Sequence, residues 1–364
     1  MKQVVIENPI LTSPFEEPRR HFKFTEDGIT DEIIGTRRIS QYFIPIPRPK
    51  KKSPKQLSFE TQWTADRIEE NRLINQIREA VEKWRKGGYI GITQTTARLL
   101  DYWKRPDREH KLFFCQIEAL ETAIWIAEVA GKYGEAWIEN RLREENAHSN
   151  PLLYRIAFKM ATGSGKTLVM NMLIAWQTLN KLASPQDARF SDTFLIVTPG
   201  ITIRDRLRVL LPNDPNNYYR LHDLVPPELL TELGKAKMVI TNFHAFKPRE
   251  RIAAGKLTKD ILKVGSNNRS NDFSRSPFTE TPDQMVRRVC RELGNKKNII
   301  VINDEAHHCY RRKVEEQEEK LTGDERKEAE QREEEARIWI SGLEAADRRH
   351  RIGHRQGAAR TGGR

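Results

Sequence analysis

The chain has 364 residues, and its 63 lysines and arginines outnumber its 51 aspartates and glutamates, which gives a formal net charge of +12. This surplus suits a nucleic-acid partner, and the length predicts one large core with a smaller appended domain. The absence of a CxxC pair argues against a disulfide framework or a closed zinc site, and no apolar run approaches the roughly 18 residues of a membrane span, so we expect a soluble cytoplasmic protein without membrane contact.

Residues 1–57 are rich in proline and turn-forming residues, and we expect an extended, linker-like region there. Within it, the run PIPRPKKKSPK at 45–55 carries basic residues without an acidic one. This run could contact the backbone of DNA, or it could be a solvated linker, and the sequence alone leaves both interpretations open.

The next segment, residues 58–110, has the pattern of a small, mainly helical lead-in region. Its first helix carries an apolar stripe and is expected to stop at Gly87. A second helix is predicted over 93–103, before a proline, and a third over 116–130. The apolar stripe of the first helix consists of Ile74, Ile77, Val81 and Trp84.

Residues 111–345 alternate short apolar runs with helical segments, which is typical of buried parallel strands joined by crossover helices. We therefore predict an α/β domain with a parallel sheet and flanking helices. The charged segment 311–337 is expected to be a solvated helical insertion, and the basic segment 346–364 a disordered tail. The predicted strands are YRIAF (154–158), TFLIVT (193–198), KMVITNF (237–243) and NIIVIND (298–304).

A glycine-rich turn, ATGSGKT, follows the first predicted strand and opens a helical segment. Backbone N–H groups of such a turn point at an anion and the helix dipole adds to their pull, which predicts a phosphate-binding loop. Lys166 would reach the β and γ phosphates, and Thr167 would ligate Mg²⁺. Met160 stands where the general pattern has glycine, and a chance glycine turn is the alternative. The candidate loop residues are Thr162, Gly163, Ser164, Gly165, Lys166 and Thr167.

Two adjacent carboxylates, Asp304 and Glu305, end the last predicted strand in the run NIIVINDEAHH. The carboxyl edge of a parallel sheet is where open α/β folds bind their ligands. Asp304 would hold Mg²⁺, usually through water, and Glu305 would orient or deprotonate the water that attacks a phosphoryl group. The adjacent His307, His308 and Cys309 could alternatively indicate a metal site.

ATGSGKT together with DEAH resembles the DEAD/DEAH-box helicases of superfamily 2 and, more narrowly, the Res subunit of type III restriction enzymes. The segments SPFEEPRRHFKF and RRISQYFIPIP are similar to the same group, so the resemblance covers most of residues 8–345. It implies a RecA-like P-loop domain that binds ATP and Mg²⁺ and couples hydrolysis to movement on DNA. Duplex DNA is the implied substrate, and a modification methyltransferase subunit is an implied partner.

Three further motifs carry the resemblance. FFCQIEAL resembles the family's Q motif, which implies that Gln116 reads the adenine edge, with Phe113 or Phe114 near the base. LIVTPGITIRDRL and VITNFHAF resemble motifs Ia and Ib, which touch a nucleic-acid strand in the family. His307 would couple the nucleotide site to the nucleic acid. The implied strand contacts are Pro199, Gly200, Arg204, Thr241 and Asn242.

Each assignment also has an interpretation as ordinary structure. Gln116 could be an amide on a helix surface, and Arg204 could be solvated. Thr241 and Asn242 could cap the turn after their strand, and the Pro-Gly pair of motif Ia could be a simple turn. Among other classes of protein, a P-loop kinase would explain ATGSGKT but not the remaining motifs. A third possibility is a DNA-binding module or inactive remnant that holds ATP without turnover.

The resemblance further implies a second RecA-like domain, which supplies an arginine finger, and a nuclease domain beyond it. No Ser-Ala-Thr motif follows DEAH, and the residues after ARIWISGLEAAD (336–347) depart from the family's patterns. We therefore expect an N-terminal motor half whose tail arises from a frameshift and whose second half could be separately encoded. On this hypothesis the chain binds ATP but hydrolyses it appreciably only when the second half is supplied.

Overall fold

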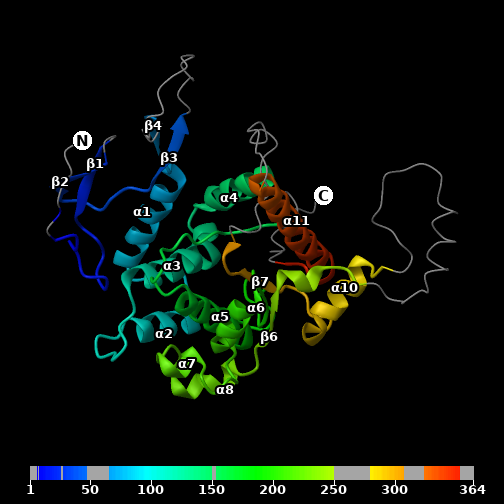
Figure 1. Cartoon of the computed structure of the whole chain (residues 1–364). Coiled ribbons are helices and arrows are strands. Elements are labelled where there is room, and N and C mark those ends of the chain that lie inside the picture. Colours follow the sequence, from blue (N-terminus) through cyan, green and yellow to red (C-terminus); the bar gives the residue numbers. More distant parts are fainter. Residues whose placement is uncertain are drawn as a thin grey trace, which may run out of the picture. The chain divides into compact units, whose positions relative to one another are not determined.

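The computed structural model of the chain describes Ile6 and residues 8–25, 28–46, 65–149, 153–249, 279–306 and 324–352. It divides into two compact units, and Figure 1 labels most of their helices and strands. The first unit consists of Met1–Arg141 with Phe158–Val169, and the second of Leu142–Ala157 with Met170–Arg364. None of the helices in the described segments combines the length and the apolar character that a bilayer crossing requires.

Two pairs of short antiparallel strands open the first unit. β1 (His21–Thr25) pairs with β2 (Gly28–Ile34), and β3 (Gln41–Ile46) pairs with β4 (Ala65–Glu70). The sequence predicts an extended region for β1, β2 and β3, but it misses β4, which lies in the segment 58–110 predicted to be mainly helical. Short strands with a single partner leave no long alternation of apolar and polar residues. The basic run at 45–55 lies outside the described residues from residue 47 onward.

The structure confirms the three helices predicted for the first unit. α1 (Arg72–Lys86) buries Ile77, Val81 and Trp84 and ends at Gly87. α2 (Gln94–Trp103) begins after Thr93, whose hydroxyl oxygen accepts a hydrogen bond from the N–H of Thr96 at 3.1 Å. The third helix comprises α3 (Phe114–Ile124), the π-helical turn η1 (Trp125–Val129) and the 3₁₀ turn η2 (Ala130–Lys132).

The second unit is built on a parallel sheet of three strands in the order β6-β5-β7. The strands are β5 (Thr193–Thr198), β6 (Lys237–Asn242) and β7 (Ile300–Asn303). Thr198 lies opposite Asn242, and Val197 lies opposite Asn303. Every residue of β5 is buried, as expected for a strand that pairs on both sides. The sheet and its flanking helices confirm the predicted α/β architecture.

The prediction of a fourth strand at 154–158 is wrong, because these residues have no regular secondary structure. The N–H of Arg155 donates to the side-chain oxygen of Asn146 at 2.9 Å, and the carbonyl of Arg155 accepts from the side-chain nitrogen of Asn146 at 2.8 Å. Asn146 lies in α4 (Ala136–Ser149). One asparagine side chain thus satisfies the backbone groups that a neighbouring strand would otherwise satisfy.

Short helices connect the strands of the second unit, and a long helix follows the last strand. One cluster of buried side chains joins the sheet to the helices at the C-terminal end of the described chain. The helical elements are α5 (Lys166–Ala183), which begins in the first unit, α6 (Ile201–Arg206), η3 (Leu207–Leu210), α7 (Tyr218–Leu221), η4 (Pro227–Leu229), α8 (Leu230–Leu233), η5 (Phe243–Phe246), α10 (Pro282–Val289), η6 (Arg291–Leu293) and α11 (Asp324–His350).

Helix α11 continues past residue 345, where the sequence suggests a domain end, to His350. Its first described turns include exposed residues at 330–334, whereas its later turns bury one face. The buried positions recur at helical spacing, so the C-terminal half of α11 packs as an amphipathic helix. Residues 307–323, which include the first part of the charged segment (311–323), lie outside the described residues. The buried positions include Ala336, Trp339, Leu343, Ala346 and His350.

Gly342 allows α11 to approach η5 closely, and we expect Gly342→Ala to destabilise the fold. A Cβ atom at this position would lie 2.4 Å from the Cγ atom of Phe246. Although alanine favours a helix, this overlap should cost about 1 to 3 kcal/mol of unfolding free energy, measured by urea denaturation. In the control Gly131→Ala the Cβ meets no described atom within 4 Å, and the change should stay within about 0.5 kcal/mol. Equal stability of both variants would contradict the close approach.

His350 anchors the end of α11. Its Nδ1–H donates to the carbonyl of Lys296 at 2.8 Å, and its own carbonyl accepts from the N–H of Asn298 at 2.8 Å. Burial lowers the pKa of His350 below its ordinary value of 6.5, and the hydrogen bond to Lys296 opposes this effect only in part. The positive charges of Arg349 and Lys297 lower the pKa further. The folded state therefore favours the neutral imidazole.

We expect the stability of the protein to fall as the pH falls below 6.5, the ordinary pKa of His350. Below this pH the imidazole of the unfolded chain becomes protonated, whereas that of the folded chain stays neutral until the pH reaches its lowered pKa. The free energy of unfolding is therefore highest above pH 6.5 and decreases as the pH falls towards the pKa of the folded state. In His350→Gln the amide can still donate to Lys296, and the decrease in melting temperature between about pH 7 and pH 5 should be smaller than in the parent. An identical decrease in both proteins would contradict the assignment.

Candidate functional site

The predicted phosphate loop is a compact turn directly before α5. Gly163 and Gly165 have φ angles of 80° and 79°, a left-handed conformation in which glycine is favoured. Both the N–H and the hydroxyl of Ser164 donate to the carbonyl of Ala161, at 3.3 Å and 2.6 Å. The N–H of Leu168 donates to the carbonyl of Gly165 at 2.9 Å, which starts the helix. Thr162 thus lies on a turn shaped by glycine, and Lys166 and Thr167 begin the helix that follows it.

Gln116 contacts this loop directly. Its side-chain Nε2 donates to the carbonyl of Ser164 at 2.9 Å, and its Oε1 accepts from the N–H of Phe113 at 2.9 Å. The residue is only 2% exposed, which overturns the alternative of a helix-surface amide. A Cβ atom at Gly165 would lie 2.2 Å from Nε2 of Gln116, so the contact also requires glycine at that position.

The start of α3 is covered by the segment SPFEEP at 13–18. The N–H of Phe114 donates to the carbonyl of Pro14 at 2.8 Å. The rings of Phe15 and Phe113 lie 5.5 Å apart in a tilted arrangement. The sequence predicts Phe113 or Phe114 near the base, and it misses Phe15. The only signal for Phe15 is that SPFEEP belongs to the lead-in segments that resemble the Res group.

A partly buried ionic network surrounds Phe114, and sequence reasoning does not find it. The guanidinium groups of Arg37 and Arg85 lie 5.5 Å and 5.0 Å from the centroid of the Phe114 ring. Arg37 donates to both carboxylate oxygens of Glu118 at 2.6 Å, and Nε of Arg85 donates to Glu121 at 2.8 Å. Because both glutamates belong to α3, the network fixes the helix that carries Gln116.

Tyr89 completes this network in the first unit. Its hydroxyl donates to the carboxylate of Glu121, which is fully buried. Burial raises the pKa of Tyr89, and the negative charge of Glu121 raises it further. The phenol therefore stays protonated and serves as a donor to Glu121 at any physiological pH.

In the second unit, the predicted nucleic-acid residues lie at or just after the carboxyl ends of β5 and β6. The hydroxyl of Thr198 lies 3.0 Å from the carbonyl of Gly200 and 3.3 Å from that of Thr241, which links the two turns. The side-chain oxygen of Asn242 accepts from the N–H of Ala245 at 3.2 Å, so the capping role foreseen for Asn242 is present.

The turn after β5 begins with Pro199 and is followed by α6. Here Nη2 of Arg204 lies 2.8 Å from a carboxylate oxygen of Asp205, and the two side chains are 41% and 58% exposed. An exposed ion pair of this kind contributes at most about 1 kcal/mol, so Arg204 could exchange this partner for another anion.

Asp304 and Glu305 follow β7 at the same edge of the sheet. The N–H of Asp304 donates to the carbonyl of Val197 at 3.0 Å and extends the pairing with β5 by one residue. The carboxylate of Asp304 accepts from the N–H of Glu305 at 3.1 Å. Glu305 has a φ angle of 51°, which is unusual for a residue with a side chain. His307, His308 and Cys309 lie outside the described residues.

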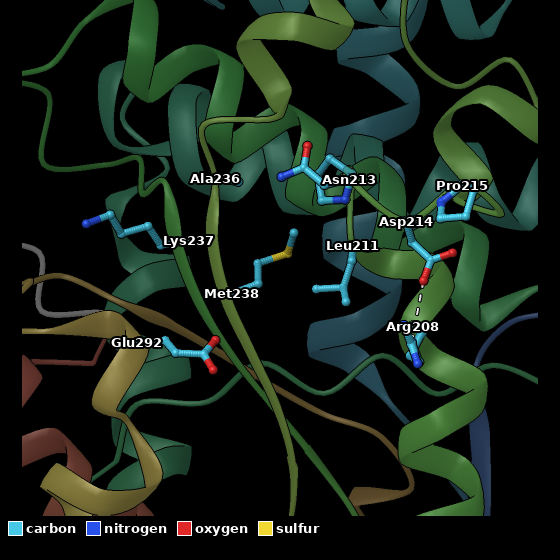
Figure 2. Close-up of a pocket in the computed structure, with 10 residues that line it drawn as sticks. Arg208, Leu211, Asn213, Asp214, Pro215, Ala236, Lys237, Met238 and Glu292 are labelled. Atoms are coloured by element: carbon cyan, nitrogen blue, oxygen red, sulfur yellow. Dashed lines mark ion pairs between the residues drawn. The ribbon is translucent and has the colours of Figure 1, made fainter.

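Figure 2 shows a pocket of about 460 Å³ at the opposite, amino end of β6. Its lining carries both signs of charge, and Arg208 pairs with Asp214 at 3.4 Å. Because the predicted nucleic-acid and carboxylate residues lie at the carboxyl ends of the strands, this pocket is separate from them. The lining consists of Arg208, Leu211, Pro212, Asn213, Asp214, Pro215, Ala236, Lys237, Met238 and Glu292.

A parallel sheet with flanking helices, a glycine-rich loop before a helix and carboxylates after a strand of the sheet together define a RecA-like P-loop domain. The family model described as type III restriction enzyme, res subunit, matches residues 109–326. The chain belongs to this family, and the matched part is an ATP-dependent, helicase-like motor domain. The match includes every candidate residue from Gln116 to His307. No curated protein and no solved structure matches the chain.

Proposed function

We propose that the chain is the ATP-binding motor half of a type III restriction-like DNA helicase or translocase. Its RecA-like domain would couple ATP hydrolysis to movement on duplex DNA when it works with a second RecA-like domain, from the same or another chain. The observation that carries this proposal is the hydrogen bond from Gln116 to the carbonyl of Ser164. It joins the motif expected to read adenine to the loop expected to hold phosphate.

The loop fits the phosphates of a nucleotide. Among the described residues, no atom lies within 4 Å of the position a Cβ would take at Gly163, so an anion could approach the backbone there. The N–H groups at the start of α5 and the helix dipole would bind the phosphates, and Lys166 would neutralise their charge. Thr167 would contribute its hydroxyl to the coordination of Mg²⁺.

Gln116 retains the capacity to read a base. A glutamine amide has two N–H donors and an oxygen with two lone pairs. One donor is used by Ser164 and one lone pair by the N–H of Phe113. The remaining donor and lone pair match the acceptor and donor on the edge of adenine, so Gln116 could hold the loop and the base together.

The carboxylates and the two turns would supply the rest of the motor. Bound Mg²⁺ would neutralise charge on the phosphates, with Asp304 as its protein ligand through water. Glu305 would hold the attacking water and accept its proton. His307 would couple this chemistry to the nucleic acid. Contact with the DNA backbone is assigned to Pro199, Gly200, Arg204, Thr241 and Asn242, and the net charge of +12 favours such contact.

The central test measures ATP hydrolysis by the full chain with and without duplex DNA, in the presence of a second RecA-like domain from a family member. We expect DNA to stimulate turnover, because an arginine finger from the second domain can contribute about 10³ to 10⁵ in rate. Glu305→Gln should keep ATP affinity and lower turnover at least about 100-fold, whereas Lys166→Ala should abolish ATP–Mg²⁺ binding in calorimetry.

Other results would identify other classes of protein. Turnover that depends on a small acceptor and ignores DNA would indicate a kinase. Binding of ATP and DNA without turnover, even with the second domain present, would indicate a nucleotide-dependent binding module. Unchanged ATP affinity in Lys166→Ala would remove the phosphate loop from the proposal.

Replacement of Gln116 separates its two proposed roles. We expect Gln116→Ala to weaken ATP binding by about 1 to 3 kcal/mol, because support of the loop and an adenine contact are both lost. GTP affinity should fall less, since only the support of the loop is lost. The control Cys115→Ala, on an exposed neighbour in α3, should leave both affinities unchanged. Equal losses for ATP and GTP in calorimetry would rule out adenine reading, and no loss would rule out both roles.

A further inference from the structure

One buried side chain contacts residues at the ends of both outer strands of the three-stranded sheet. Trp339 lies on α11 and is 0% exposed. Its indole Nε1–H donates to the side-chain oxygen of Asn303 at 3.2 Å. Its ring stacks on Phe243 with a centroid distance of 5.2 Å and an interplanar angle of 4°. Asn303 ends β7 and directly precedes Asp304, whereas Phe243 directly follows β6.

These two contacts bridge strands that do not pair with each other. β5 lies between β6 and β7 in the sheet, so no backbone ladder joins the turn after β6 to the turn after β7. Trp339 supplies a side-chain connection between the two turns instead. A displacement of Phe243 would change the packing of the indole ring and, through its N–H, the position of Asn303.

The turn after β6 is also held firmly against two helices. Arg288 of α10 donates to the carbonyl of Ala245 at 3.0 Å and to that of Lys247 at 3.2 Å. Nε of Arg288 additionally donates to Glu280 at 2.8 Å. On the other side, Gly342 of α11 allows the ring of Phe246 to pack against the helix backbone. η5 therefore contacts both α10 and α11, and α11 is the helix that carries Trp339.

We propose that Trp339 is a positioning residue that couples the nucleic-acid turn after β6 to the carboxylate turn after β7. This inference rests on the proposed function, because it assigns DNA contact to Thr241 and Asn242 and Mg²⁺ chemistry to Asp304. Packing alone accounts for the stacking on Phe243. Packing does not explain why the acceptor of the indole N–H is Asn303, the residue directly before Asp304. That hydrogen bond turns a core residue into a link between two sites.

The first experiment measures affinity for a non-hydrolysable ATP analogue with Mg²⁺, with and without duplex DNA, on the full chain and the second RecA-like domain. The ratio of the two affinities reports the coupling of the sites. Trp339→Phe keeps an aromatic ring against Phe243 but removes the N–H. We expect the ratio to fall about fivefold or more, while the affinity without DNA changes less than about twofold.

The matched control is Trp176→Phe. Trp176 is a second buried tryptophan, on α5, and it packs edge-on against Phe190 at 5.9 Å. This variant should leave the ratio at the parental value. The inference is overturned if Trp339→Phe keeps the parental ratio, or if Trp176→Phe lowers it to the same extent. Asn303→Ala removes the acceptor instead of the donor, so it should reproduce the loss, and it decides the outcome if Trp339→Phe does not fold.

The second experiment requires no DNA and separates this inference from the proposed function. Hydrogen exchange is followed by mass spectrometry in the segments 241–246 and 300–305 of the nucleotide-free chain. Trp339→Phe should accelerate exchange in both segments relative to the parent, whereas Trp176→Phe should not. Unchanged exchange in either segment would overturn the link. If DNA does not change the affinity of the parent for the ATP analogue, but Trp339→Phe still accelerates exchange in both segments, the DNA-coupled motor is rejected. The structural link through Trp339 then remains supported.

Discussion

The pairing of β5 on both of its edges is the constraint on which the second unit depends. All six residues of this strand are buried, so each backbone N–H and carbonyl needs a partner within the protein. An unsatisfied group would cost about 1 to 3 kcal/mol, which makes the parallel register with β6 and β7 difficult to shift. That register places Asn242 opposite Thr198 and Asn303 opposite Val197. The turns that carry the candidate functional residues therefore lie at one edge of the sheet, because the buried strand β5 pairs in parallel with both of its neighbours.

In the first unit, the equivalent constraint is the close approach of Gln116 to the phosphate loop. Glycine at position 165 makes room for the amide, and the salt bridges of Arg37 and Arg85 with α3 keep Gln116 at that distance. Partly buried ion pairs give little net stability, since desolvation offsets their attraction. Their effect here is to define one position for the start of α3. The loop conformation thus depends on charged residues far from it in the sequence.

The sequence predicts the features whose signals are local. Three strands were recognisable from apolar, β-branched runs, and the phosphate loop from its glycines between a predicted strand and a helix. Residues 154–158 carry the same apolar signal, but Asn146 takes the backbone hydrogen bonds of Arg155 at their centre, which no pattern within the run reveals. Contacts between distant residues are equally hidden: Gln116 and Ser164 are 48 positions apart, and Trp339 and Asn303 are 36 apart. The buried stripe of α11 follows a highly charged segment, which obscured its periodicity.

The backbone of Glu305 gives the link through Trp339 its mechanical importance. A left-handed residue with a side chain costs about 1 to 3 kcal/mol, and it persists only where its surroundings leave no alternative. Here the bond from Asp304 to Val197 and the bond from Glu305 to the Asp304 carboxylate hold the turn. Asn303 is the residue from which this turn departs, so in the proposed coupling a displacement of Asn303 would act on the segment that holds Glu305 in its left-handed conformation. A contact on Asn303 can therefore alter the direction of a carboxylate two residues away without any contact to it.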